Sequence, residues 1–188
     1  MNINHNVEEE EDEPVSGDEL DWTPDFHWLT DNLAVGGCFP VERAAELARS
    51  HAIRAIVDLR EEECDDAELL TSVGIDFLHL PTTDQFAPPR EWLDRGVEFT
   101  QRHMRRGNRV LIHCQSGIGR SPLLALCVLV AEGHEPLAAL SSSKDTRELI
   151  SPSHAQYVAW TDWLRSRRIQ APDYHTFGCI AYRHLASG

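Results

Sequence analysis

The stretch Val110-Leu111-Ile112-His113-Cys114-Gln115-Ser116-Gly117-Ile118-Gly119-Arg120-Ser121-Pro122 indicates how this chain folds around one site. It predicts a short apolar strand, then a glycine-containing loop between a cysteine and an arginine, then an apolar helix with proline in its first turn. A loop that joins a strand to a helix N-terminus directs unpaired backbone N–H groups and the positive end of the helix dipole into one hollow. We therefore expect an anion site here, with phosphate as the anion.

The residues at the two ends of this loop add chemistry to the anion site. Cys114 lies where the helix dipole and the Arg120 guanidinium both favour a thiolate, which is the nucleophilic form of cysteine. Arg120 offers a planar pair of donors to two oxygens of a tetrahedral anion. Gly117 and Gly119 allow the backbone to approach that anion closely. Ser121 is placed to donate a hydrogen bond to the Cys114 sulfur.

The segment from His113-Cys114 to Arg120-Ser121 resembles the His-Cys-x5-Arg-Ser/Thr signature of the cysteine-dependent protein tyrosine phosphatase superfamily. Its Gly-Ile-Gly-Arg-Ser-Pro part is most similar to the small atypical dual-specificity phosphatases, and the resemblance covers about residues 26–169. It implies a cysteinyl-phosphate intermediate, and it implies that His113 shapes the loop by hydrogen bonding. The residues expected to bind phosphate are Gln115, Ser116, Gly117, Ile118, Gly119 and Arg120.

Asp84 is the candidate general acid. It lies between a predicted strand and a predicted helix, where a mobile carboxylate can move over a pocket and protonate the departing oxygen. The acid loop of the family resembles this segment, because its aspartate also follows a His-Leu-Pro sequence by a few residues. A helix cap or Asx turn is the structural alternative for Asp84. Asp76 and Asp94 are poorer candidates, since they are predicted within a strand and a helix.

Strands and helices are expected to alternate along the chain, which predicts an α/β domain with a mixed, mostly parallel sheet of about five strands flanked by helices. The resemblance implies a dual-specificity phosphatase-like fold, with the site at the carboxyl end of the central strand. The aromatic residues of 22–28 are expected to pack the chain onto this domain. Strands are predicted at 32–35, 53–59, 75–80 and 109–113, and helices at 40–50, 67–73, 89–106, 121–132, 136–143 and 154–168.

Length and charge indicate a single domain with an acidic N-terminal tail. The chain has 188 residues and a net charge of −14, and residues 1–21 hold nine acids with no Lys or Arg. We therefore expect a disordered acidic tail at 1–21, a phosphatase domain at 22–169 and a partly docked extension at 170–188. Since the rest of the chain is only mildly acidic, nucleic acid and membranes are not expected as partners.

No cofactor or metal is expected. The five cysteines form no Cys-x-x-Cys pair, and the chain lacks both a signal-peptide pattern and an apolar run that could cross a bilayer. A catalytic thiolate also suits a reducing compartment. The expected protein is a cytoplasmic monomer whose partner is its phosphorylated protein substrate.

The expected function is metal-independent hydrolysis of phosphoproteins, at phosphotyrosine, with phosphoserine and phosphothreonine left open. Phosphoinositide-directed relatives tend to carry lysines in the loop, whereas Gln115, Ser116 and Ile118 are uncharged. Alternatives are a phosphatase of a phospholipid or phosphorylated sugar, a catalytically silent phosphate-binding module, and a redox sensor at Cys114.

Other polar residues are given structural interpretations. Gln156 resembles a glutamine that positions water in some members of the superfamily, but a surface position is the preferred interpretation. Lys144, the only lysine, is assigned no function. The acids Glu61, Glu62, Glu63, Asp65 and Asp66 are interpreted as a solvated loop, and Tyr157, Trp160, Trp163 and Leu164 as core.

Overall fold

A computed structural model describes residues 22–185, and a five-stranded sheet forms its centre. The strand order is β1-β2-β5-β3-β4, with β1 antiparallel to β2 and the other neighbours parallel. This confirms the predicted α/β domain with a mixed, mostly parallel sheet. The predicted acidic tail lies outside the described residues. The strands are β1 (Phe26–Thr30), β2 (Leu33–Gly36), β3 (Ile53–Arg60), β4 (Asp76–Thr82) and β5 (Arg109–His113).

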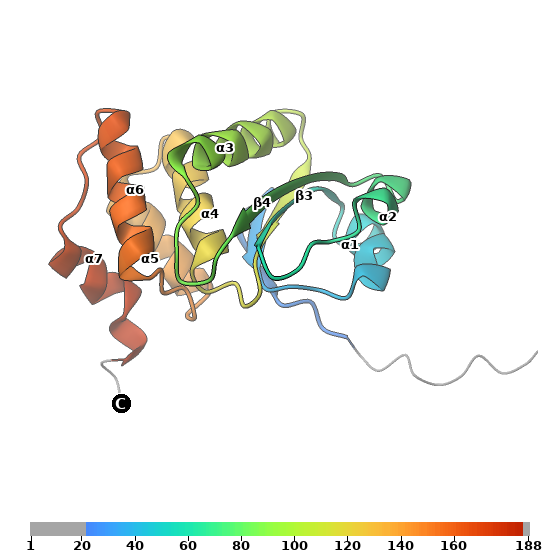
Figure 1. The fold of residues 1–188 in the computed structure, drawn as a ribbon, viewed down its shortest axis with the longest axis horizontal. Helices are drawn as coiled ribbons and strands as arrows, with labels where there is room; N and C mark the ends of the chain where they lie inside the picture. The colour runs from blue at the N-terminus through green and yellow to red at the C-terminus, as the bar shows by residue number, and fades with distance from the viewer. Residues whose placement is uncertain (1–21, 186–188) are drawn as a thin grey trace, which may run out of the picture.

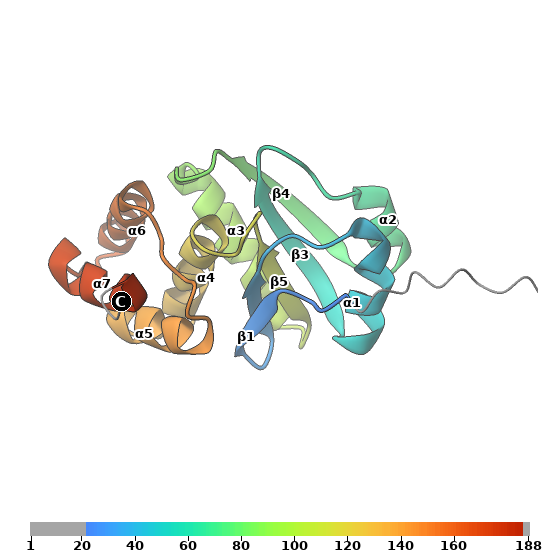
Figure 2. The ribbon, with the colours of Figure 1, turned by 90° about the horizontal axis from the view of Figure 1, so that it is seen from below.

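Helices cover both faces of the sheet (Figures 1 and 2). Helices α1 (Ala44–Ser50) and α2 (Ala67–Ser72) pack on one face, and α3 (Arg90–Met104) and α4 (Arg120–Ala131) pack on the other. Three further helices lie beyond α4 (Figure 1), and the first of them also packs against β1. They are α5 (Pro136–Thr146), α6 (His154–Ser166) and α7 (Tyr174–Ala181).

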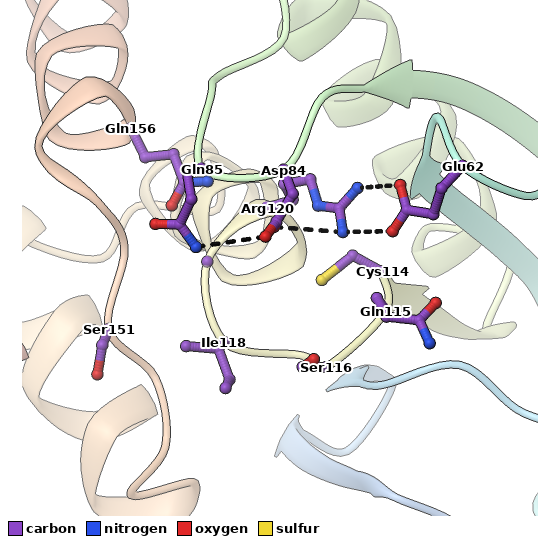
Figure 3. A pocket seen from close by; sticks show the side chains of 11 residues that line it. Glu62, Asp84, Gln85, Cys114, Gln115, Ser116, Ile118, Arg120, Ser151 and Gln156 are labelled. Carbon is purple, nitrogen blue, oxygen red and sulfur yellow. Dashed lines mark hydrogen bonds and ion pairs between the residues drawn. The ribbon is translucent and has the colours of Figure 1, made fainter.

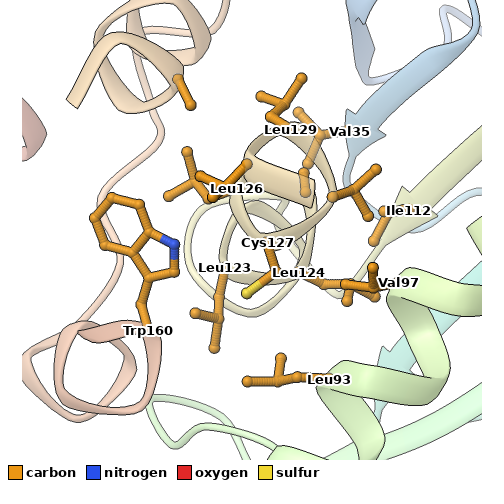
Figure 4. Close-up of a cluster of buried hydrophobic side chains, with 14 of the residues drawn as sticks. Val35, Leu93, Val97, Ile112, Leu123, Leu124, Leu126, Cys127, Leu129 and Trp160 are labelled. Carbon is orange, nitrogen blue, oxygen red and sulfur yellow. The ribbon is translucent and has the colours of Figure 1, made fainter. Parts of the chain in front are cut away.

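Helix α4 is surrounded on all sides, which explains why its sequence is apolar all round. Figure 4 shows Val35 and Ile112 of the sheet on one side of it and Trp160 of α6 on another. Every residue from Arg120 to Val130 is buried. Because α4 follows the Cys114–Arg120 segment directly, this packing fixes where that segment lies.

Strand β1, helix α7 and a 3₁₀ turn at Arg183–Leu185 were not predicted from the sequence. Residues 26–30 form the edge strand β1, whose half-buried positions do not alternate regularly between apolar and polar. Residues 174–181 form α7, a helix too short to give a clear period, with Asp173 as its N-cap. The predicted helix at 40–50 begins instead with a 3₁₀ turn at Val41–Arg43. No helix within residues 22–185 is long and apolar enough to cross a membrane.

Substitution of Phe177 tests whether α7 unfolds together with the rest of the domain. Its side chain is fully buried and its ring contacts those of Tyr157, Trp160 and Tyr182. We expect Phe177→Ala to lower the free energy of unfolding by about 3–5 kcal/mol, because it leaves a cavity between α6 and α7. Urea denaturation measures this change.

The matched control is Leu185→Ala, at a side chain that is 72% exposed. Its effect should stay within about 0.5 kcal/mol. A similarly small effect of Phe177→Ala would mean that α7 unfolds separately from the domain.

Candidate active site

A hollow of about 150 Å³ lies at the carboxyl ends of β3, β4 and β5. Its walls come from three loops that follow these strands and from the N-terminal end of α6 (Figure 3). This is the edge of the sheet where the sequence placed the site. The lining residues are Glu62, Asp84, Gln85, Cys114, Gln115, Ser116, Ile118, Gly119, Arg120, Ser151 and Gln156.

Cys114 stands at the start of the anion loop, as we call residues 114–120. Its side chain is buried, and its Sγ lies 3.3 Å from the Ser121 Oγ. The same hydroxyl donates to the Gly36 carbonyl oxygen at 3.2 Å. Since a hydroxyl has one proton, the predicted donation from Ser121 to sulfur competes with this bond. A thiolate would favour the sulfur as acceptor.

The carbonyl groups of the anion loop face outward. The Gln115 oxygen accepts from Cys38 N at 3.1 Å, the Ile118 oxygen from Ser151 N at 2.8 Å, and the Gly119 oxygen from Leu123 N at 2.9 Å. In a trans peptide the N–H group points away from the C=O group of the same unit. The amides that follow these carbonyls are therefore turned the other way, which is the arrangement an anion site needs.

Arg120, at the end of the anion loop, is only 2% exposed and is held by an acidic partner. Its Nη1 and Nη2 donate to the two carboxylate oxygens of Glu62 at 2.7 and 2.8 Å, and Nη1 also donates to the Thr82 carbonyl oxygen. Burial alone would lower the pKa of Arg120, but the bonds and charge of Glu62 raise it overall. Its buried Nε has no hydrogen-bond partner among the described residues, so one donor remains for a ligand.

Asp84, the predicted general acid, lies beside this arginine. We call residues 83–89, which include Asp84, the acid loop. The Asp84 Oδ1 lies 3.3 Å from the Arg120 Nη2, and the Asp84 side chain is 66% exposed. In Figure 3 the Arg120 guanidinium stands between Asp84 and Glu62. The structure thus brings together Cys114, Arg120 and Asp84, which the sequence predicted as the catalytic residues.

Gln156 is buried, so the preferred interpretation of it as a surface residue was wrong. It is the N3 residue of a capping box in which Ser153 caps α6, and this turns its side chain toward the pocket. Its Nε2 donates to the Phe86 carbonyl oxygen at 2.9 Å, which ties the acid loop to α6. A Cβ at Gly119 would lie 2.5 Å from the Gln156 Oε1, so this glycine permits the close approach.

The acids of residues 61–66 are not simply a solvated loop, as the sequence had suggested. Glu62 binds Arg120, and Asp65 is buried, where it accepts from Arg60 and contacts His113 Nε2 at 2.9 Å. His113 therefore has a hydrogen-bond partner that can hold its ring beside Cys114. These pairs could not be predicted from the sequence, because the partners are far apart along the chain: Glu62 and Arg120 are separated by 58 positions.

Three buried groups, Asp58, Asp65 and His113, have potential metal-ligand atoms within 4.8 Å of one another. The guanidinium of Arg60 hydrogen-bonds to both carboxylates. Its single positive charge offsets one of the two negative charges, and its donors occupy oxygens of both carboxylates that a cation would need.

Lys144, in α5, is not among the residues that line the hollow, and it is fully buried. Its Nζ donates to the Ile150 carbonyl oxygen at 2.8 Å and lies 2.7 Å from the His184 Nδ1. Burial lowers the pKa of this lysine to about 8. The bonds fix the segment that leads to Ser151, whose amide binds the anion loop. Apart from the rarity of lysine, no feature of the sequence indicated this role.

Comparison with known families agrees with this geometry. The model of the family described as "Tc-R-P: Polymorphic toxin system, DSP-PTPase phosphatase" matches residues 36–134, more than half of the chain. The chain belongs to this family. The resemblance inferred from the Cys114–Arg120 segment is thereby confirmed at the level of a cysteine-dependent phosphatase family.

Curated relatives are between 24% and 33% identical to this chain over the matched regions. The phosphatidylglycerophosphate phosphatase PTPMT1 of Arabidopsis thaliana is 29% identical over 131 residues, which cover 68% of this chain and 39% of the relative. The human phosphatidylglycerophosphatase and protein-tyrosine phosphatase 1 is 24% identical over 113 residues, which cover 56% of each protein. The chain thus spans about two fifths to somewhat more than half of these relatives.

Solved structures show the same fold. The structure of PTPMT1 in complex with PI(5)P superposes with a TM-score of 0.70 at 20% identity, covering 75% of this chain and 95% of that one. The structure of Tk-PTP in the active form gives a TM-score of 0.69 at 25% identity, covering 76% and 97%. These likenesses confirm the dual-specificity phosphatase-like fold.

The Glu62–Arg120 pair predicts a pH-dependent contribution to stability. The hydrogen bonds from Arg120 lower the pKa of Glu62 from 4.5 to about 2. A carboxyl group whose pKa is lower in the folded state stabilises the fold above its unfolded pKa, and this contribution is lost as the pH falls toward the folded pKa. Wild type should therefore be more stable than Glu62→Gln near neutral pH, and the difference should shrink between pH 4.5 and 2.

Urea denaturation at several pH values measures this difference. The control is Glu98→Gln, which removes an exposed carboxylate of α3 that is not among the hydrogen-bond or ion-pair partners of Arg120 and should show no such trend. A difference between wild type and Glu62→Gln that stays constant with pH would contradict the assigned ion pair.

Proposed function

We propose that this protein hydrolyses phosphomonoesters of phosphoproteins through a cysteinyl-phosphate at Cys114, without a metal ion. The observation that carries the proposal is the convergence of a thiol, a guanidinium and a carboxylate, from two separate loops, on one hollow lined by the anion loop. A silent phosphate-binding module has no chemical need for the thiol or for the nearby Asp84.

The first step forms the S–P bond and breaks the P–O bond of the ester. The Cys114 thiolate attacks phosphorus in line with the departing oxygen, which takes the proton of Asp84. Arg120 Nε and the loop amides bind the other three phosphate oxygens, where charge develops. Asp84 is exposed on its loop, so it can turn from Arg120 toward the departing oxygen.

The second step breaks the S–P bond. Water attacks phosphorus and gives its proton to the Asp84 carboxylate, which restores the acid. The Ser121 hydroxyl, 3.3 Å from the sulfur, stabilises the departing thiolate by a hydrogen bond. Cys114 and inorganic phosphate are the products at the site.

The proposed substrate class rests on the walls of the hollow. Arg120 is the only Lys or Arg among the described lining residues, while Glu62 and Asp84 are acidic. A substrate with several phosphates would meet repulsion from these acids. Two apolar side chains border the site, Phe86 at 62% exposure and Ile118 at 37%. An apolar border suits the phenyl ring of phosphotyrosine.

A phospholipid with one terminal phosphate is the second candidate substrate. It is favoured by the curated relatives, several of which are named phosphatidylglycerophosphate phosphatases. An apolar border is also compatible with a phosphate presented at a lipid surface.

Hydrolysis of p-nitrophenyl phosphate in EDTA tests the reaction. Wild type should turn over the substrate, Cys114→Ser should abolish turnover, and Asp84→Asn should lower kcat by about 10²–10⁴-fold because the general acid is lost. A wild-type protein that binds vanadate without any turnover would overturn the enzymatic proposal in favour of a binding module.

The substrate class is tested by comparing kcat/KM for a phosphotyrosine peptide with that for phosphatidylglycerophosphate in mixed micelles. We expect kcat/KM to be higher for the peptide than for the lipid. Cys114→Ser serves as the inactive control for both substrates. Preference for the lipid would replace the phosphoprotein proposal with the second candidate. Phe86→Ala should raise KM for the peptide, since it removes apolar surface beside the site.

A further inference from the structure

Arg147 is a buried arginine outside the hollow, just beyond the end of α5. It is 2% exposed, and none of the predicted catalytic residues is among its hydrogen-bond partners. A buried guanidinium is costly unless its donors and its charge are satisfied. The groups that satisfy it therefore indicate what it does.

Two partners of Arg147 are carbonyl groups of the anion loop. Its Nε donates to the Gly117 oxygen at 3.1 Å, and its Nη2 donates to the Ser116 oxygen at 2.9 Å. These are the two carbonyls of residues 115–119 that do not accept from a backbone amide. Arg147 thus completes the set of outward-facing carbonyls described above.

We infer that Arg147 is a positioning residue that sets the orientation of the peptide groups in the anion loop. A planar peptide whose C=O group points at Arg147 must point its N–H group away from it. For the Gly117–Ile118 peptide, this turns the amide of Ile118, a residue that lines the hollow, away from Arg147. This deepens the proposed function, on which it rests, because it accounts for how the amides come to face a phosphate.

Gly117 is held from its other side as well. Its φ angle is +65°, and a Cβ on it would lie 2.4 Å from the Gly36 carbonyl carbon. The loop therefore passes between the end of β2 and the Arg147 side chain. Only glycine tolerates both the backbone conformation and the contact.

Arg147 is itself fixed by the N-terminal strand. Its Nη1 and Nη2 donate to the two carboxylate oxygens of Asp25 at 2.6 and 3.0 Å, and its Nη1 donates to the His27 Nδ1 at 3.1 Å. The bond from Arg147 lowers the pKa of Asp25, which keeps that carboxylate ionised. Asp25 also accepts from Gly37 N through its backbone oxygen at 2.9 Å. Asp25 thus holds Arg147 on one side of the anion loop and Gly37, the neighbour of Gly36, on the other.

The test compares oxyanion affinity with stability. Arg147→Met removes the donors, Arg147→Lys keeps the charge without the planar pair of donors, and Asp25→Asn removes the charge that holds Arg147. Leu47→Ala is the control, because it destabilises the domain at a fully buried residue of α1 that belongs to the other hydrophobic cluster. For each variant we would measure vanadate affinity by calorimetry, kcat and KM for p-nitrophenyl phosphate, and the free energy of unfolding.

We expect Arg147→Met to weaken vanadate binding and lower kcat/KM by about 10²-fold, since removing one donor to an oxyanion from an enzyme active site costs about 10²–10³-fold. Arg147→Lys and Asp25→Asn should show smaller losses of the same kind. Leu47→Ala should lose stability but keep its vanadate affinity. If Arg147→Met does not fold, Arg147→Lys and Asp25→Asn decide the question.

Vanadate affinity within twofold of wild type in the folded Arg147 and Asp25 variants would overturn the inference. So would a loss in Leu47→Ala as large as that in the Arg147 variants, because destabilisation alone would then explain it. Failure of the proposed function is a separate outcome, seen as a wild type that binds vanadate but has no turnover. The vanadate affinities of the variants test the role of Arg147 in that case too.

Discussion

The burial of the Arg120 guanidinium is the constraint on which the site depends. A charge that is 98% removed from solvent must be compensated nearby, and its partners are in the loop that follows β3 and at the end of β4. Glu62 supplies the carboxylate, and Thr82, two residues before Asp84, supplies a carbonyl. Arg120, at the start of α4, thereby connects the carboxyl ends of β3, β4 and β5. The hollow is what this arrangement leaves open.

The sequence was informative wherever the chemistry is local. The stretch from Val110 to Pro122 predicted the strand, the loop and the helix, and the loop containing Asp84 was predicted from its place after a strand. The sheet and most helices followed from patterns of apolar residues. These features depend on residues that are close together along the chain, so they can be predicted from a single sequence.

Features that depend on distant pairing could not be predicted in this way. Nothing near Glu62 indicates that its partner is Arg120, and nothing near Arg147 points to Asp25, 122 positions away. Gln156 was interpreted as a surface residue although the helix start at 154 was predicted, because the Ser-x-x-Gln spacing of a capping box from Ser153 to Gln156 was not used. Strand β1 and helix α7 are short, and their burial comes from the neighbours they meet. Moreover, Asp25, Arg147, Ser151 and Gln156 all lie outside the segment matched by the family model, which ends at residue 134. The support of the anion loop therefore extends beyond the part of the chain that identifies the family.

The position of Lys144 has a consequence for covalent modification. It is the only lysine in the chain, and its ammonium group is enclosed by the Ile150 carbonyl and His184. All other positively charged side chains, apart from any protonated histidines, are arginines, whose guanidinium groups do not react as amines do. Acylating reagents, acetyltransferases and ubiquitin ligases that act on lysine find no accessible side chain on the folded domain. Modification at Lys144 would require either residues 148–151 or the segment that holds His184 to move, and movement of residues 148–151 would release Ser151 from the anion loop.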